Sequence, residues 1–360
     1  MKNNSQLMLQ IYRDPEGMQN LSLSDWDLLI RQARGCNMLA RLAWLAEQKE
    51  LKSSIPAQVV KHLESALQLS EGHERSVKWE INRVCHALKS CDTPVILLKG
   101  AAYLIRGFDV GKGRIFNDID LLVRKEKLRK VESSLLLNGW TTTHHDPYDQ
   151  MYFREWMHEL PPLKHIHRQS VLDVHHTILP VTAYLKPDIK NIFDCIEPVA
   201  GLSQVYTLSS VDMVLHSATH LFHEGEFQTG FRGLCDLDGL LRHLSAKSDN
   251  FWSELLVRAN QLDLQKPLYY ALSYSREILN TPVPEDIQRK IAEAAPAGFF
   301  KAVMRRLYLY ALMPYHHTCD RSFSAAARWM LFVRSHYIKM PLRLLIPHLF
   351  RKAFISDKKD

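Results

Sequence analysis

Apolar residues recur at three- and four-residue spacing through the first part of the chain, from Leu21 to Lys89. This spacing places them on one face of a helix with 3.6 residues per turn. The segment offers few side chains suited to catalysis. We therefore expect residues 1–90 to form a helical leader.

The pattern changes after the turn residues Cys91–Pro94, where apolar runs become too short for helices. Short apolar runs bounded by turn residues indicate buried strands. Strands and helices alternate from here in the order strand, helix, strand, helix, strand. The expected elements are a strand at 95–98, a short helix after Lys99, a glycine-containing loop at 109–114, a strand at 119–123, a helix at 125–137, a β segment at 140–145 and two further strands within 157–167 and 169–176.

Beyond Pro187 the apolar spacing is again helical and remains so to the end of the chain. We therefore expect an α+β protein. Its core, a small mixed sheet with helices, would occupy residues 91–186, between the helical leader and a helical C-terminal region at 187–360.

The composition is that of an ordinary globular protein, with 360 residues of which 46% are hydrophobic. It excludes collagen-like and wholly disordered chains, and the length suggests two or three domains. The six cysteines form no CxxC pair, which fits a reducing compartment. No signal-peptide-like or membrane-spanning run is present, so we expect a cytoplasmic protein.

The positive charge is concentrated at the C-terminus. Residues 301–360 carry 12 Lys and Arg against 3 Asp and Glu, whereas the whole chain has a formal charge of +7. Aromatic residues are interleaved with cations between Arg321 and Lys352: Trp329, Phe332, Tyr337 and Phe350. This segment, 321–352, could contact single-stranded nucleic acid or an anionic membrane surface, or could be a helical cap with a basic exterior.

The sharpest local pattern is Asn117-Asp118-Ile119-Asp120-Leu121. Residues i and i+2 of a strand share a face, so Asp118 and Asp120 would lie side by side while the apolar residues between them enter the core. Two carboxylates this close favour a hard divalent cation such as Mg²⁺ or Mn²⁺. A solvated strand end is the alternative for such a motif.

Histidines form a second pattern. His216, His220 and His223 stand at i, i+4 and i+7 of an expected helix. Such a face could bind zinc, pack as a polar seam, or face a ligand cleft with Arg232 and Asp236 nearby. No HExxH motif accompanies them. His158 and His175 could also line the cleft.

These motifs together resemble the nucleotidyltransferases of the DNA polymerase β superfamily, which combine a small-residue phosphate-binding turn, a DxD strand and a third carboxylate. Lys99-Gly100, Arg114, Asp118-Ile119-Asp120 and Asp173 occupy the corresponding places. More closely, ILLKGAAYL…GRIFNDIDLLV is similar to a largely uncharacterised family of bacterial nucleotidyltransferases. Lys99-Gly100 departs from the superfamily, which usually has Gly-Ser at this turn.

The resemblance implies residue roles. Asp118 and Asp120 would hold Mg²⁺ or Mn²⁺ and through it the phosphates of a nucleoside triphosphate (NTP), with Asp173 completing the site. Lys99, Gly100 and Arg114 would contact the triphosphate, and Asn117 would orient a carboxylate.

The implied reaction is transfer of a nucleoside monophosphate from an NTP to an unidentified acceptor, a small molecule, protein or RNA, with release of pyrophosphate. A catalytically inactive nucleotide-binding scaffold and a transferase that modifies tRNA-like RNA are the alternatives.

Overall fold

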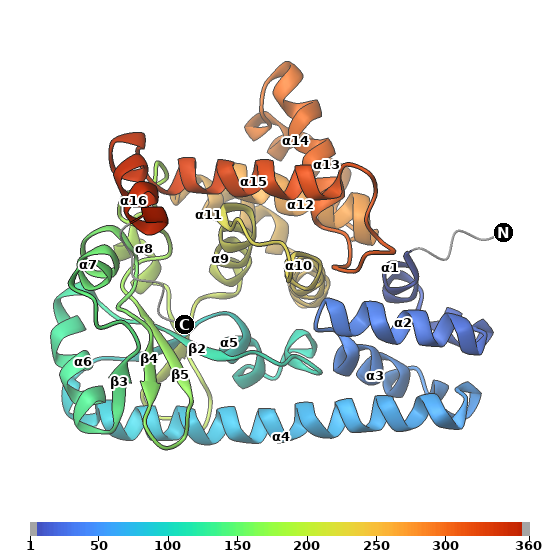
Figure 1. The fold of residues 1–360 in the computed structure, drawn as a ribbon, viewed down its shortest axis with the longest axis horizontal. Helices are drawn as coiled ribbons and strands as arrows, with labels where there is room; N and C mark the ends of the chain where they lie inside the picture. The colour runs from blue at the N-terminus through green and yellow to red at the C-terminus, as the bar shows by residue number, and fades with distance from the viewer. Residues whose placement is uncertain (1–5, 355–360) are drawn as a thin grey trace.

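A seven-stranded mixed sheet lies at the left of the computed structural model, which describes residues 6–354 (Figure 1). The strand order is β3-β4-β5-β2-β1-β7-β6. β2 is parallel to β5 and β1 to β7, and the other neighbours are antiparallel. The strands are β1 (Val95–Leu97), β2 (Asp118–Leu122), β3 (Trp140–Thr142), β4 (Leu163–His165), β5 (Val171–His175), β6 (Glu197–Pro198) and β7 (Val205–Thr207).

The central pair, β2 and β5, sets the position of the aspartates. Asp120 lies opposite Asp173 in the parallel register. Because side chains alternate between the two faces of a strand, Asp118, Asp120 and Asp173 share one face. The intervening Ile119 and Leu172 are buried, so the alternation predicted from the sequence is confirmed.

Helices before the sheet form the lower and right-hand parts of the molecule (Figure 1). α2 begins with a capping box, in which the side chain of Ser22 and that of Asp25 each accept a hydrogen bond from the other's backbone N–H. The 32-residue α4 follows Pro56 and runs along the lower edge of the view. The helices are α1 (Leu7–Arg13), α2 (Leu23–Gly35), α3 (Leu39–Gln48) and α4 (Ala57–Leu88).

Short helices connect the strands, and most of the longer helices follow β7, with the ends of α9 and α15 reaching the aspartate face of the sheet. The connecting helices are α5 (Lys99–Ile105), α6 (Leu128–Leu137), α7 (Pro147–Met151) and α8 (Ile189–Phe193). The later helices are α9 (Ser210–His223), α10 (Gly230–Ser245), α11 (Phe251–Gln261), α12 (Gln265–Leu279), α13 (Glu285–Ile291), α14 (Gly298–Ala311), α15 (Ser324–Lys339) and α16 (Leu342–Phe354).

The expected α+β class, a small mixed sheet flanked by helices, is confirmed, but two details were wrong. Residues beyond Pro187 are not purely helical, because β7 pairs in parallel with β1 and β6 pairs with β7. Residues 147–156 form α7 and a π-helical turn, so only 163–165 of the expected 157–167 segment is a named strand. Strands of two or three residues are too short to show a periodicity.

Buried side chains from the leader, the sheet and the C-terminal helices belong to one hydrophobic cluster, which extends from Leu7 to Leu331. The division at residues 90 and 186 stays a prediction. The sheet itself draws strands from both sides of the second boundary.

Candidate active site

Three carboxylates converge at the centre of the sheet. Ligand atoms of Asp118, Asp120 and Asp173 all lie within 4.8 Å of one another. They come from β2 and β5, whose hydrogen-bonded pairing fixes their spacing. The structure therefore brings together the three residues that the sequence singled out.

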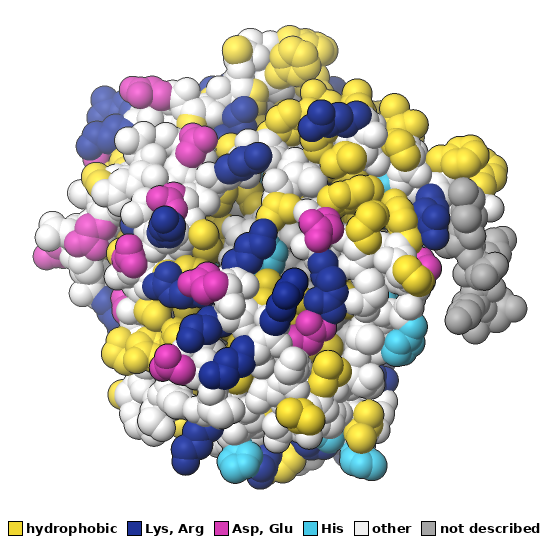
Figure 2. Space-filling model, turned by 90° about the vertical axis from the view of Figure 1, so that its left-hand side faces the viewer, with side chains coloured by type: hydrophobic (Ala, Val, Ile, Leu, Met, Phe, Trp, Pro, Cys, Tyr) yellow, Lys and Arg dark blue, Asp and Glu magenta, His cyan; other side chains and the backbone are white. Residues whose placement is uncertain are grey.

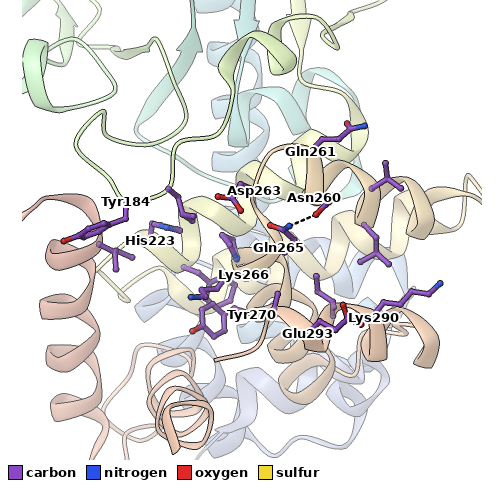
Figure 3. A pocket seen from close by; sticks show the side chains of 18 of the residues that line it. Tyr184, His223, Asn260, Gln261, Asp263, Gln265, Lys266, Tyr270, Lys290 and Glu293 are labelled. Atoms are coloured by element: carbon purple, nitrogen blue, oxygen red, sulfur yellow. Dashed lines mark hydrogen bonds between the residues drawn. The ribbon is translucent and has the colours of Figure 1, made fainter. Parts of the chain in front are cut away.

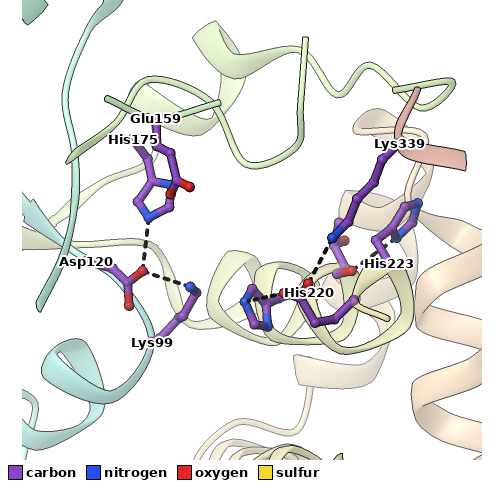
Figure 4. Close-up of polar contacts among 9 residues, drawn as sticks. Lys99, Asp120, Glu159, His175, His220, His223 and Lys339 are labelled. Carbon is purple, nitrogen blue, oxygen red and sulfur yellow. Dashed lines mark hydrogen bonds and ion pairs between the residues drawn. The ribbon is translucent and has the colours of Figure 1, made fainter. Parts of the chain in front are cut away.

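Two cationic groups hold Asp120. Lys99 Nζ lies 2.7 Å and His175 Nε2 lies 2.9 Å from Asp120 Oδ1, and Figure 4 shows both side chains pointing at this carboxylate. On its other side, His175 Nδ1 is 3.3 Å from Glu159 Oε2. Burial alone would raise the pKa of Asp120, but the charges of Lys99 and His175 hold it well below its usual range.

Asp173 differs from Asp120 in its hydrogen bonding and in the direction of its pKa shift. Its Oδ1 atom is buried and has no hydrogen-bond partner among the described residues. Burial, followed by the nearby Glu159, Asp120 and Asp118 carboxylates, raises the pKa of Asp173 to about 8. Both properties suit a divalent cation site, because such an ion would supply a partner for the oxygen and offset the repulsion.

Asp118 and Asp173 line a cavity of about 250 Å³ that lies between the sheet and the ends of α9 and α15. Its far wall contains His220, His223, Glu224 and Lys339. Glu224 accepts a hydrogen bond from Lys339 Nζ at 2.8 Å and lies 3.2 Å from His220 Nε2 (Figure 4). We call this space the carboxylate cavity.

Two larger cavities each share one wall residue with the carboxylate cavity. Asp118 also lines a cavity of about 850 Å³ with Asn117 and the exposed ring of Trp79. His223 also lines a cavity of about 1120 Å³ between α9, α11, α12 and α15, where Tyr184 and Tyr270 contribute rings (Figure 3). Both volumes suit organic ligands. We call them the Trp79 cavity and the Tyr270 cavity.

A comparison with models of protein families identifies the family of this chain. A family model described as "Uncharacterised nucleotidyltransferase" matches residues 22–280. This chain belongs to that family. Searches of curated proteins and of solved structures found no match. The matched region contains all three carboxylates and ends before α13.

The role of the remaining phosphate-binding candidates, Lys99, Gly100, Arg114 and Asn117, stays a prediction. Lys99 lines the carboxylate cavity, whereas Asn117 lines only the Trp79 cavity. Arg114 is mostly buried and donates to Asp236 at 2.9 Å. A Cβ added at Gly100 would overlap the Arg114 guanidinium. Glycine is therefore needed at this position for Arg114 to pack closely.

Of the three histidines predicted to share one helix face, two line this site. His220 and His223 line the carboxylate cavity, whereas His216 is buried and does not line it. The zinc alternative is not supported, because this set is absent from the groups of converging ligand atoms found among the described residues. His158 and His175 do line the cavity, and with Glu159 they form a second converging group.

Sequence reasoning missed Glu159, Glu224 and Lys339 as members of the cavity wall. Glu159 lies in an irregular segment joined to β5 only by an isolated bridge to His175. Lys339 ends α15 and is separated by more than 200 residues from the strand that carries Asp118. No periodicity or spacing signal connects such residues.

The basic segment 321–352 forms α15 and most of α16. Several of its cations pair with acidic residues of the rest of the chain: Arg328 with Asp320, Lys339 with Glu224, Arg351 with Asp146 and Lys352 with Asp149. No helix within residues 6–354 has the length and apolar character required to cross a membrane. Contact of this segment with nucleic acid stays a prediction.

Proposed function

We propose that this protein is a Mg²⁺-dependent enzyme that transfers a nucleoside monophosphate from an NTP to an acceptor hydroxyl, with release of pyrophosphate. One observation carries the proposal: a buried, unpartnered oxygen of Asp173 belongs to a cluster with Asp118 and Asp120 whose ligand atoms lie within 4.8 Å of one another. The arrangement is also what the resemblance to the DNA polymerase β superfamily implies.

Asp118, Asp120 and Asp173 would hold the ion, for which carboxylate oxygens are the preferred ligands. When bound, Mg²⁺ neutralises phosphate charge and orients the reacting oxygens. The chain supplies a fixed ligand geometry, because β2 and β5 are hydrogen-bonded neighbours. Lys99 and His175 lower the pKa of Asp120 and so keep it ionised, which is the form in which a carboxylate binds a metal ion.

In the proposed reaction, the acceptor oxygen forms a bond to the α-phosphorus and the bond from that phosphorus to the β-phosphate oxygen breaks. The pyrophosphate leaves, and the hydroxyl proton passes to a carboxylate of the cluster. Catalysis consists mainly of positioning and charge neutralisation.

Two reactants require space on either side of the carboxylates. We assign the nucleotide to the Trp79 cavity, where Trp79 offers a ring for stacking and Arg75 and Lys164 offer cations. We assign the acceptor to the Tyr270 cavity, which adjoins the carboxylate cavity through His223. In-line displacement needs the acceptor and the leaving group on opposite sides of the phosphorus.

Transfer of α-labelled phosphate from each NTP to candidate acceptors in Mg²⁺ tests the proposal. We expect Asp118→Asn and Asp173→Asn to lower transfer by roughly 10²-fold or more, because each removes a metal ligand. Asp249→Asn changes an exposed carboxylate far along the chain and serves as the matched control. Equal transfer by the wild type and the two cluster variants would contradict the proposal.

A nucleotide-binding scaffold without turnover is the second candidate. The ion pair between Lys99 and Asp120 favours it, because the ammonium group already neutralises one of the proposed metal ligands. Calorimetry with NTP and Mg²⁺ distinguishes the two functions. Nucleotide binding without pyrophosphate release across a broad set of acceptors would favour the scaffold.

A further inference from the structure

The outer faces of α15 and α16 expose an unusual amount of apolar surface. On α15, Trp329, Val333 and Tyr337 are four residues apart and 66%, 47% and 47% exposed. On α16, Leu342, Ile346 and Phe350 follow the same spacing and are 51%, 63% and 57% exposed. Residues four apart share a helix face. We call these six residues the C-terminal apolar surface.

Packing within the chain does not account for this surface. Each helix already buries its other face, through Ala327 and Leu331 on α15 and through Leu345 and His348 on α16. An ordinary surface helix directs its apolar face inwards and its polar face to solvent. Rows of exposed apolar side chains on two helices that contact each other indicate a contact with another surface.

The charge around the surface indicates the kind of contact. Residues 321–354 contain seven Lys and Arg and no Asp or Glu, and four of these cations, Arg328, Lys339, Arg351 and Lys352, pair with acidic residues elsewhere in the chain. Arg343 stands among the apolar residues of α16, is exposed, and has no ion pair within residues 6–354. In Figure 2, hydrophobic side chains gather on the upper right of the face that includes α16, with Lys and Arg side chains among them.

We propose that the C-terminal apolar surface seats the protein on an anionic lipid bilayer, with α15 and α16 lying in the plane of the interface. Apolar side chains enter the boundary between headgroups and acyl chains, where Trp and Tyr are favoured. Cations beside them meet lipid phosphates. Two copies of this surface, in contrast, would bring like charges together.

This orientation places an entrance to the interior beside the bilayer. Tyr337 belongs to the C-terminal apolar surface and also lines the Tyr270 cavity, where its ring packs 5.5 Å from that of Tyr184. Lys339, two residues later, lines the carboxylate cavity. Docking through α15 therefore brings the rim of the Tyr270 cavity to the lipid surface.

Flotation of the full chain with vesicles tests the proposal without using catalysis. One set of vesicles is pure phosphatidylcholine and the other contains about 30% phosphatidylglycerol. We expect binding to the anionic vesicles that weakens between about 0.05 M and 0.5 M NaCl, because salt screens the phosphates.

Substitutions distinguish vesicle binding through the C-terminal apolar surface from nonspecific adsorption of the protein to vesicles. The double variant Ile346→Glu and Phe350→Glu should bind anionic vesicles roughly tenfold less, since it removes apolar contacts and adds repulsion. Arg343→Gln should lower binding to the anionic vesicles more than binding to the neutral ones. Leu69→Glu is the matched control, because Leu69 is 68% exposed but lies on α4. Unchanged circular dichroism and thermal unfolding of each variant show that the fold is intact.

Light scattering of the same samples tests self-association. Failure of the wild type to bind anionic vesicles would overturn the proposal. A loss of vesicle binding by Leu69→Glu equal to that of the double variant would also overturn it. A wild-type dimer that the double variant converts to a monomer, without vesicle binding by either, assigns the surface to a second copy instead and also overturns it.

Discussion

Lys99 holds a backbone conformation that lysine rarely adopts, with φ of +47°, and its ammonium group lies 2.7 Å from Asp120. A left-handed conformation costs a non-glycine residue about 1–3 kcal/mol where the surrounding structure enforces it. The nearly buried ion pair offsets this cost. The position of Lys99 is therefore a compromise that favours the carboxylate site over local backbone preference.

Replacing Lys99 by methionine should reveal this ion pair. Lys99→Met leaves the buried Asp120 charge with only His175, and we expect the free energy of unfolding to fall by about 2–4 kcal/mol. Urea titration measures the loss. Adding Asp120→Asn should recover part of it, because the uncompensated charge is gone. Lys301→Met, at an exposed position, is the control, and a loss no larger than that of the control would contradict the role given to Lys99.

At the scale of residues, the sequence predicted those side-chain positions that follow from strand alternation and local spacing. Asp118 and Asp120 share a face because they are two residues apart in a strand, and Asp173 lies beside them because β5 pairs with β2. The partners of Lys99 and Arg114 were not predictable. Arg114 meets Asp236 across more than 120 residues, and only tertiary packing brings them together.

At the scale of elements, α9 carries two buried histidines, His216 and His223, whose pKa values are lowered. His216 is 5% exposed, and burial, assisted by the charge of Lys99, lowers its pKa well below the usual range. Burial also lowers the pKa of His223 to about 4. Both rings are therefore neutral near pH 7, and their protonation is disfavoured in the folded state.

This element should make the fold sensitive to acid. Below about pH 6.5 the unfolded chain binds protons that folded His216 does not, so the free energy of unfolding decreases as the pH falls, by up to about 1.4 kcal/mol per pH unit for each histidine. His216→Leu should reduce this slope between pH 7 and pH 5 in urea titrations. His62→Gln, on the exposed face of α4, should leave it unchanged. An unaltered slope in His216→Leu would show that another group governs the acid sensitivity.

Elements with a strong period were predicted, and short irregular ones were not. The long apolar spacing of α4 and the alternation of β2 and β5 are visible in the sequence. β6 and β7 contain two and three residues and are specified by pairing with β1 and each other rather than by their own pattern. The π-helical turn at 152–156 likewise has no sequence period of its own.

At the scale of the whole molecule, a mixed sheet presents carboxylates and later helices close the site over them. The family match ends at residue 280, yet Lys339 of α15 completes the wall of the carboxylate cavity. Two hydrogen bonds to backbone carbonyls of α15 connect this helix to the segment that follows β5: Thr182 Oγ1 donates to the Lys339 carbonyl at 2.7 Å, and the Tyr184 amide donates to the Ile338 carbonyl. The C-terminal helices are thus part of the site as well as the proposed lipid contact.

Anomalous diffraction from crystals grown with Mn²⁺ and a nonhydrolysable NTP tests the central claim most directly. We predict an anomalous peak about 2.0–2.2 Å from carboxylate oxygens of Asp118, Asp120 and Asp173, bridging them to the nucleotide phosphates. A nucleotide bound elsewhere, or a cluster without a peak while Lys99 stays on Asp120, would contradict the claim that these three carboxylates form a metal-dependent transferase site.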